Sequence, residues 1–245
     1  PCNGNATPLT TAWRGGAWRD GAGQGGGRRC ARASVTSHAL LPIARAGPIL
    51  LEMQDFSGEP EIDLTGQLLI AMPGMGDPRF DRSVIFLCAH SVEGAMGLVL
   101  NHPVADLTFD ELLGQLDISP SAELEGVPVH MGGPVEHGRG FVLHSADYDE
   151  SDATLQVSAE FGMTATLDIL EDIAHGRGPS RTLMALGYAG WGPGQLEGEI
   201  ARNAWLTVQA SSAIVFETKA DQKWERALAT LGIDPLSLSA AAGRA

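Results

Sequence analysis

The chain has 245 residues, of which 44% are hydrophobic and 19% are charged, a composition typical of a folded globular protein with a sizeable core. Residues 53–245 hold ten of the 16 basic and 28 of the 30 acidic residues, so they carry a net charge of −18, whereas residues 1–52 carry +4. Because non-specific DNA affinity is built from Lys and Arg contacts with phosphates, this charge argues against direct DNA binding.

Residues 1–52 differ in composition from the rest of the chain. Five glycines fall between positions 21 and 27, arginines are dense, and no apolar period is present, so no packed element is expected there. A Tat-like signal at Arg28-Arg29 and an organellar transit peptide are two alternatives. We favour a disordered or spurious extension ahead of a true start at Met53. The domain prediction is therefore an extension over residues 1–52 and a single α+β domain over residues 53–245.

Strand and helix patterns alternate from Leu64 onward. Short apolar or β-branched runs predict strands at residues 68–71, 84–89, 98–101, 127–131, 141–144, 154–158, 183–188, 205–209 and 214–216. A capping box at Thr108-Phe109-Asp110-Glu111 opens a first helix, and helical spacing predicts further helices before Gly176, at residues 195–203 and at residues 220–231. Many strands, few helices and connections of mixed length predict an α+β fold with a mixed, largely antiparallel sheet and flanking helices.

The most distinctive stretch is residues 187–197, where four glycines and a proline surround Trp191. Such a sequence requires unusual backbone angles beside a large apolar ring, which indicates a shaped loop. Gln195 and Glu199 follow on one face of the next helix, close in sequence to Tyr188 and Trp191. This polar face is the best candidate for a binding pocket, and an ordinary solvated helix face is the alternative.

A glycine pair forms the second candidate segment. Gly132, Gly133 and Pro134 precede a predicted strand, and glycines allow a close approach either to a ligand or to a neighbouring strand. Phosphate cradling is not expected, because no Walker lysine follows and Glu136 stands where an anion would dock. The predicted ligand-binding residues are Gly132, Gly133, Pro134, Tyr188, Trp191, Gln195 and Glu199.

Three histidines recur every seven residues at His130, His137 and His144. In an antiparallel hairpin His130 and His144 would approach one another and, with Asp147 or Glu136, would make a zinc set. No HxxxH or HExxH spacing supports this, so a histidine bonded to a buried carbonyl is the favoured interpretation.

Catalytic candidates are few. A hydrolase that uses His144 with Asp147 or Ser145 is the alternative to a non-catalytic protein, and it requires these groups within hydrogen-bond reach. Cys88 lies in an apolar run with no local cation, which predicts a core residue and not a reactive thiol. The three cysteines form no CxxC pair, and no run of about 18 apolar residues predicts a membrane helix.

Three blocks of sequence together carry a family resemblance. They are residues 66–103, which include Gly66-Gln67-Leu68-Leu69-Ile70-Ala71-Met72-Pro73, then Gly132-Gly133-Pro134-Val135 with Phe141-Val142-Leu143-His144-Ser145, and residues 187–205. Through them the chain from about Leu64 onward resembles the YqgE/AlgH family of bacterial proteins. The resemblance implies an α+β fold with a bifurcated, partly barrel-like sheet, and a transcriptional-regulator label without an established activity. The family commonly ends in Gly-His-Ala, whereas this chain has Gly243-Arg244-Ala245.

The sequence thus predicts a cytoplasmic, non-catalytic regulatory module that binds an unknown small molecule or protein partner. No catalytic residue, metal ligand or cofactor is assigned, and neither direct DNA binding nor membrane association is expected.

Overall fold

The fold is that of a computed structural model, which describes residues 63–121, 127–148 and 153–238. These residues belong to one of the two compact units into which the chain divides. The expectations for residues 1–52, for a start at Met53 and for the ending Gly243-Arg244-Ala245 lie outside the described residues. A single domain over residues 53–245 stays a prediction.

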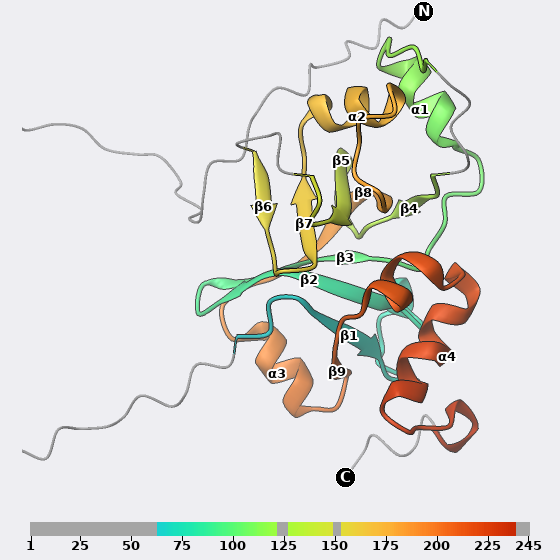
Figure 1. The fold of residues 1–245 in the computed structure, drawn as a ribbon. Helices are drawn as coiled ribbons and strands as arrows, with labels where there is room; N and C mark the ends of the chain where they lie inside the picture. The colour runs from blue at the N-terminus through green and yellow to red at the C-terminus, as the bar shows by residue number, and fades with distance from the viewer. Residues whose placement is uncertain (1–62, 122–126, 149–152, 239–245) are drawn as a thin grey trace, which may run out of the picture. The chain divides into compact units, whose positions relative to one another are not determined.

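A nine-stranded sheet forms the framework of this unit (Figure 1). The strands run in the order β6-β7-β5-β8-β3-β2-β1-β9, and β4 pairs with β8 beside this path. Among the described strands, every pairing is antiparallel except that of β4 with β8. The strands are β1 (Gln67–Ala71), β2 (Val84–Ser91), β3 (Gly94–Val99), β4 (Val129–Met131), β5 (Val135–Ser145), β6 (Thr154–Gln156), β7 (Phe161–Thr164), β8 (Thr182–Trp191) and β9 (Trp205–Gln209). The predicted α+β class with a largely antiparallel sheet is confirmed.

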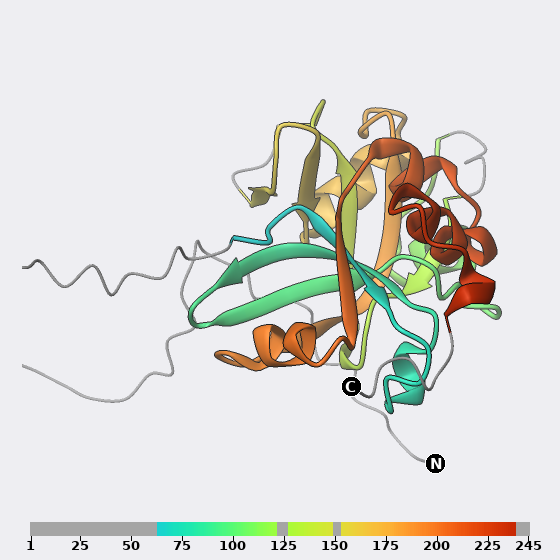
Figure 2. The same ribbon diagram turned by 90° about the horizontal axis from the view of Figure 1, so that it is seen from below.

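Strand β8 joins the two halves of the sheet. Its first part pairs with β5 on one side and with β4 on the other, and its last three residues pair with β3. The sheet curls around this junction into a half-barrel, as the family resemblance implied (Figure 2). Strand twist of constant hand is the physical source of such curling.

Four α-helices flank the sheet: α1 (Phe109–Gln115), α2 (Leu167–Ala174), α3 (Gln195–Ala201) and α4 (Ala220–Thr230). The predicted capping box is present, because the Thr108 hydroxyl accepts from the Glu111 amide while the Glu111 carboxylate accepts from the Thr108 amide. Short helical turns lie at η1 (Pro78–Phe80), η2 (Ala213–Glu217) and η3 (Pro235–Ser237).

Apolar residues of the two sheet faces collect in three core clusters. The first packs one face of the sheet against α4 and η2, with Leu68, Phe86, Trp224 and Leu228 among its members. The second uses the opposite face of β1 and β2 and packs against α3, with Leu69, Ile85 and Leu196. The third places α1 and α2 on β4, β5 and β8. Strand alternation divides neighbouring residues between these clusters.

Several predicted elements differ from the structure. Residues 214–216 are predicted as a strand but lie in the π-helical turn η2. The prediction is wrong because a short apolar run with buried residues, here Ile214 and Val215, fits a strand and a helical turn equally well. Strand β7 was not predicted, and β8 extends to Trp191, beyond the predicted end at residue 188. Residues 129–131 and β5 do not form the expected hairpin, since β4 pairs with β8 in parallel.

Candidate functional site

The structure brings three of the predicted site residues together around one carboxylate. The indole Nε1 of Trp191 donates to Oε2 of Glu199 at 3.0 Å, and the amide of Gln195 donates to Oε1 at 3.0 Å. A second indole, that of Trp205, donates to the same Oε2 at 2.7 Å. We call Glu199 with Trp191, Trp205 and Gln195 the indole clasp. Charge-assisted bonds of this kind are stronger than neutral ones.

The two tryptophans of the clasp are core residues. Trp191 is 7% exposed and Trp205 is 2% exposed, and their rings meet edge to face with centroids 6.0 Å apart. Each indole has one N–H group, which needs a hydrogen-bond acceptor when the ring is buried. The carboxylate of Glu199 accepts a hydrogen bond from both indoles. Burial alone would raise the pKa of Glu199, but the hydrogen bonds from Trp205, Gln195 and Trp191 outweigh it and lower the pKa.

The glycines of the signature loop set the path of the backbone into α3. Gly194 adopts a left-handed conformation with φ of 69° at the start of the helix, where a residue with a Cβ is strained. The side-chain oxygen of Gln195 accepts from the amide of Gly192 at 3.1 Å and so closes the turn. Residues 192–195 are exposed, which leaves a fixed loop on the surface above the clasp.

Gly132 and Gly133 lie against the backbone of β8. A Cβ at Gly132 would overlap the carbonyl of Gly187, and a Cβ at Gly133 would overlap the backbone of Tyr188. The glycine pair therefore permits a close approach between chain segments, one of the two roles that the sequence allowed. Pro134, half-buried, follows at the entry to β5.

Tyr188 is separated from the indole clasp. Its ring packs edge-on against Phe141, with centroids 5.8 Å apart, in the first core cluster, whereas Trp191 belongs to the second. The seven predicted ligand-binding residues thus form two groups and not one pocket: the clasp residues with α3, and Tyr188 with the glycine pair. Their role in ligand binding stays a prediction.

His144 is buried and its two ring nitrogens are both engaged. Nδ1 lies 2.8 Å from the carbonyl oxygen of Ser145, and Nε2 lies 3.0 Å from the Thr164 hydroxyl. The Ser145 hydroxyl donates to Asp147 and does not reach the imidazole. Within the described residues no hydrogen bond joins His144 to the Ser145 hydroxyl or to Asp147, and the ring contacts a backbone carbonyl, as the favoured interpretation of the sequence expected.

The other proposed chemistry is also distributed differently. His130 lies on β4 and His144 on β5, strands that do not pair with each other, and the described residues contain no group of three or more metal-ligating side chains. Cys88 is buried, and burial raises the pKa of its thiol, as expected for a core residue. Sequence reasoning named Trp205 in the signature block without assigning it to the site, and it did not single out Lys223, a buried lysine of α4.

The chain is similar in sequence to proteins of a known family. The sequence model of the AlgH-like family matches residues 68–236. The chain belongs to this family. Relatives include an UPF0301 protein of Ruegeria pomeroyi, 63% identical over 185 residues, and one of Cereibacter sphaeroides, 59% identical over 184 residues; each alignment covers 75% of this chain and 100% of the relative.

Two solved structures share the fold. The solution structure of AlgH from Pseudomonas aeruginosa is similar with a TM-score of 0.62 and 40% identity, covering 80% of this chain and 96% of that one. A crystal structure of a Corynebacterium diphtheriae protein, 20% identical, shares the fold with a TM-score of 0.56 and covers 71% of this chain and 89% of that one. Within the described residues, no helix is long and apolar enough to cross a membrane.

Proposed function

We propose that this protein is a non-catalytic regulatory module that recognises a small molecule or a protein through the surface formed by α3 and residues 192–194. The observation that carries the proposal is the indole clasp. Both oxygens of Glu199 are occupied by donors from the protein itself, so the signature residues are arranged to hold a shape and present no free acid, base or nucleophile.

A surface held in this way suits recognition. The loop at residues 192–194 and the side chains of Gln195 and Glu197 are exposed, while the groups beneath them are fixed by hydrogen bonds. Glu197 accepts from His90 Nε2 at 2.9 Å, which ties α3 to β2. Because a rigid binding surface loses little conformational entropy on association, such preorganisation favours affinity.

The proposal places the protein in the bacterial cytoplasm, without direct contact to DNA. The described thiol, Cys88, is free and buried, and the net charge of −18 over residues 53–245 disfavours a polyanionic partner. Regulation would then act through a metabolite or another protein.

A small-molecule screen tests the proposed surface. Thermal unfolding is measured with a metabolite library for wild type, Gln195→Ala and the matched control Gln222→Ala, an exposed glutamine on α4. A ligand of this surface raises the midpoint of wild type and of Gln222→Ala equally, and raises that of Gln195→Ala much less. A ligand that stabilises all three proteins equally contradicts the proposed surface.

A protein partner is tested by site-specific crosslinking. A photo-crosslinking residue replaces Pro193 in one protein and Gln222 in the other, and both are expressed in the native bacterium. An adduct of defined mass at position 193 and not at 222, whose purified partner binds wild type more tightly than Gln195→Ala, supports the proposal. Failure of this experiment and of the ligand screen together rejects it.

A further inference from the structure

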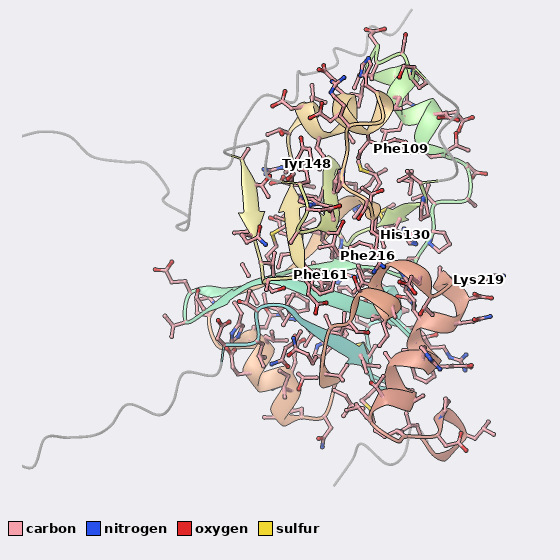
Figure 3. The ribbon with its side chains drawn as sticks, viewed as in Figure 1. Phe109, His130, Tyr148, Phe161, Phe216 and Lys219 are labelled. Carbon is pink, nitrogen blue, oxygen red and sulfur yellow. The ribbon has the colours of Figure 1, made fainter. Side chains whose placement is uncertain are left out.

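Lys223 is a buried cation on α4. The chain contains two lysines, Lys219 at the start of α4 and Lys223 one turn later. Lys219, which is labelled in Figure 3, is exposed, whereas Lys223 is only 3% exposed. The Lys223 ammonium donates to the carbonyl oxygen of Val215 in η2 at 2.6 Å, and among the described residues no carboxylate forms an ion pair with it. A buried charge without a counter-ion is costly.

His130 lies near this ammonium with an unsatisfied nitrogen. In β4, His130 pairs with Ala185, a member of the core cluster that packs against α4. The His130 side chain lies on the side of β4 that faces the C-terminal helical segment (Figure 3). The residue is 2% exposed, and its Nδ1 makes no hydrogen bond of good geometry in the described part of the chain, although the carbonyl groups of Pro128 and Met184 lie close enough to raise the pKa of the ring. Burial, followed by the charge of Lys223, lowers the pKa of His130 to about 4, so the ring is neutral at pH 7.

A second polar pair continues the cluster towards solvent. The Ser83 hydroxyl lies 3.2 Å from Nε2 of His102, which is half-buried, and His102 interacts electrostatically with His130. Asp81 is the acidic group that acts on His102. On the cationic side, Arg82 lies over the Trp224 ring of α4, with 5.1 Å between its guanidinium carbon and the ring centroid.

We propose that Lys223 and His130 form a binding site for a small oxyanion, such as a carboxylate or a phosphate group, with His102 on its solvent side. The ammonium has three N–H donors and uses one on Val215, so two are available. A neutral imidazole can place its proton on Nδ1 and donate to the same anion. The anion would supply a counter-charge to Lys223 and a well-aligned acceptor for the His130 Nδ1 proton, neither of which the described residues provide.

This site shares no residue with the surface proposed above. Lys223 and His130 belong to the side of the sheet that packs against α4, whereas the indole clasp belongs to the cluster that packs against α3. The oxyanion site therefore does not rest on the proposed function, and either proposal can fail without the other.

Sulfate is the probe for the first test, because it keeps its charge throughout the neutral and alkaline range. Thermal unfolding of the full chain is followed in sodium sulfate and in sodium chloride of equal ionic strength, for wild type, Lys223→Met and Lys219→Met. Methionine keeps the length of the side chain and removes a buried charge, a change that is often neutral or stabilising. Lys223→Met is therefore expected to fold.

The expected result is a sulfate-specific rise of the midpoint in wild type and in Lys219→Met. In Lys223→Met the apparent affinity for sulfate falls by at least about tenfold, the effect of losing one charge-assisted hydrogen bond. General salting effects act equally on the three proteins and cancel in the comparison. An equal sulfate response in all three proteins overturns the proposal.

Imidazole NMR provides a readout that does not depend on stability. The ring nitrogens of His130 are followed during titration of wild type with sulfate, phosphate and acetate, and those of exposed His175 serve as the internal control. A saturable shift of His130 Nδ1 without a shift of His175 supports the site. The anion with the lower midpoint identifies the phosphate or the carboxylate source, and unchanged His130 signals with all three anions reject the proposal.

Discussion

The first prediction concerns Trp191, a single residue of the indole clasp. Trp191 fills space that its glycine neighbours leave empty, and its burial comes from tertiary packing against Trp205 and α3. Trp191→Ala is expected to lower the free energy of unfolding by about 3–5 kcal/mol, the usual range for deleting a large buried aromatic side chain. Urea unfolding measures the change. A loss below about 1 kcal/mol, typical of a surface substitution, would contradict the structural role.

The carboxylate of the clasp gives a pH-dependent prediction. Glu199→Gln removes the charge that accepts two indole N–H groups, and we expect a loss on the order of 2 kcal/mol at pH 7. Because the folded pKa is lowered, the contribution of Glu199 is complete above the unfolded value of about 4.3 and is lost as the pH falls through the folded value. The difference between wild type and Glu199→Gln should therefore shrink in acid.

The control for this experiment is Glu225→Gln, an exposed carboxylate on α4. Its unfolding free energy should stay within about 0.5 kcal/mol of wild type. Urea midpoints measured at several pH values for the three proteins decide the matter. A Glu199→Gln deficit that does not vary with pH would show that packing and not charge is lost.

Lys223 gives a pH dependence of the same sign in a different, alkaline range. Burial lowers its pKa to about 8, whereas the unfolded value is about 10.4, so the unfolded chain binds more protons between these pH values. Wild-type stability is therefore expected to rise relative to Lys223→Met as the pH increases through this range, by a total on the order of 3 kcal/mol. Lys219→Met should follow wild type. Parallel curves for wild type and Lys223→Met would show that the ammonium is not destabilised by burial.

Among the contacts between elements, the approach of the glycine pair to β8 leaves no room for a side chain at Gly133. A Cβ at Gly133 would overlap the backbone of Tyr188 and Ala189, and backbone atoms in a paired strand cannot move aside at low cost. Gly133→Ala is expected to destabilise by at least about 3 kcal/mol or to prevent folding. The matched control is Gly138→Ala, where a Cβ meets nothing within 4 Å. Circular dichroism during urea unfolding compares the two, and equal stability would contradict the packing argument.

The element predictions succeeded where one local signal was sufficient. Thr108 and Glu111 mark the start of α1, and the apolar run of residues 68–71 is a strand because both of its faces are buried. They failed where the position of an element depends on strand pairing with a distant segment. Residues 129–131 and β5 looked like the arms of a hairpin, but both lie against β8, a partner more than 35 residues further along the chain.

At the scale of the whole molecule, charge predicts the class of partner. Residues 53–245 carry −18, so we expect no salt-sensitive DNA binding by a protein that starts at Met53. Gel-shift assays compare this protein with the full chain over a range of salt concentrations. Binding by the full chain alone would assign the affinity to the arginine-rich residues 1–52. Salt-sensitive binding by the shorter protein would contradict this prediction and would support direct regulation of transcription through DNA binding.

The amino-acid sequence was sufficient to predict the fold class, the family and the residues of the signature block. These follow from local patterns: strand runs, a capping box, and glycines that only a shaped loop requires. It did not determine which of those residues meet. Strand alternation sends Tyr188 and Trp191 into different core clusters, and the sequence gives no sign that Trp205 shares the carboxylate of Glu199.

The environment of the polar groups, in contrast, follows from tertiary packing. Lys223 looks like an ordinary helix-surface lysine in the sequence, with the same residue type four positions earlier at Lys219. The packing of α4 and η2 against the sheet buries one and leaves the other in solvent. Burial, pairing and the pKa shifts that follow from them depend on contacts between segments far apart in the chain, and no local pattern encodes those contacts.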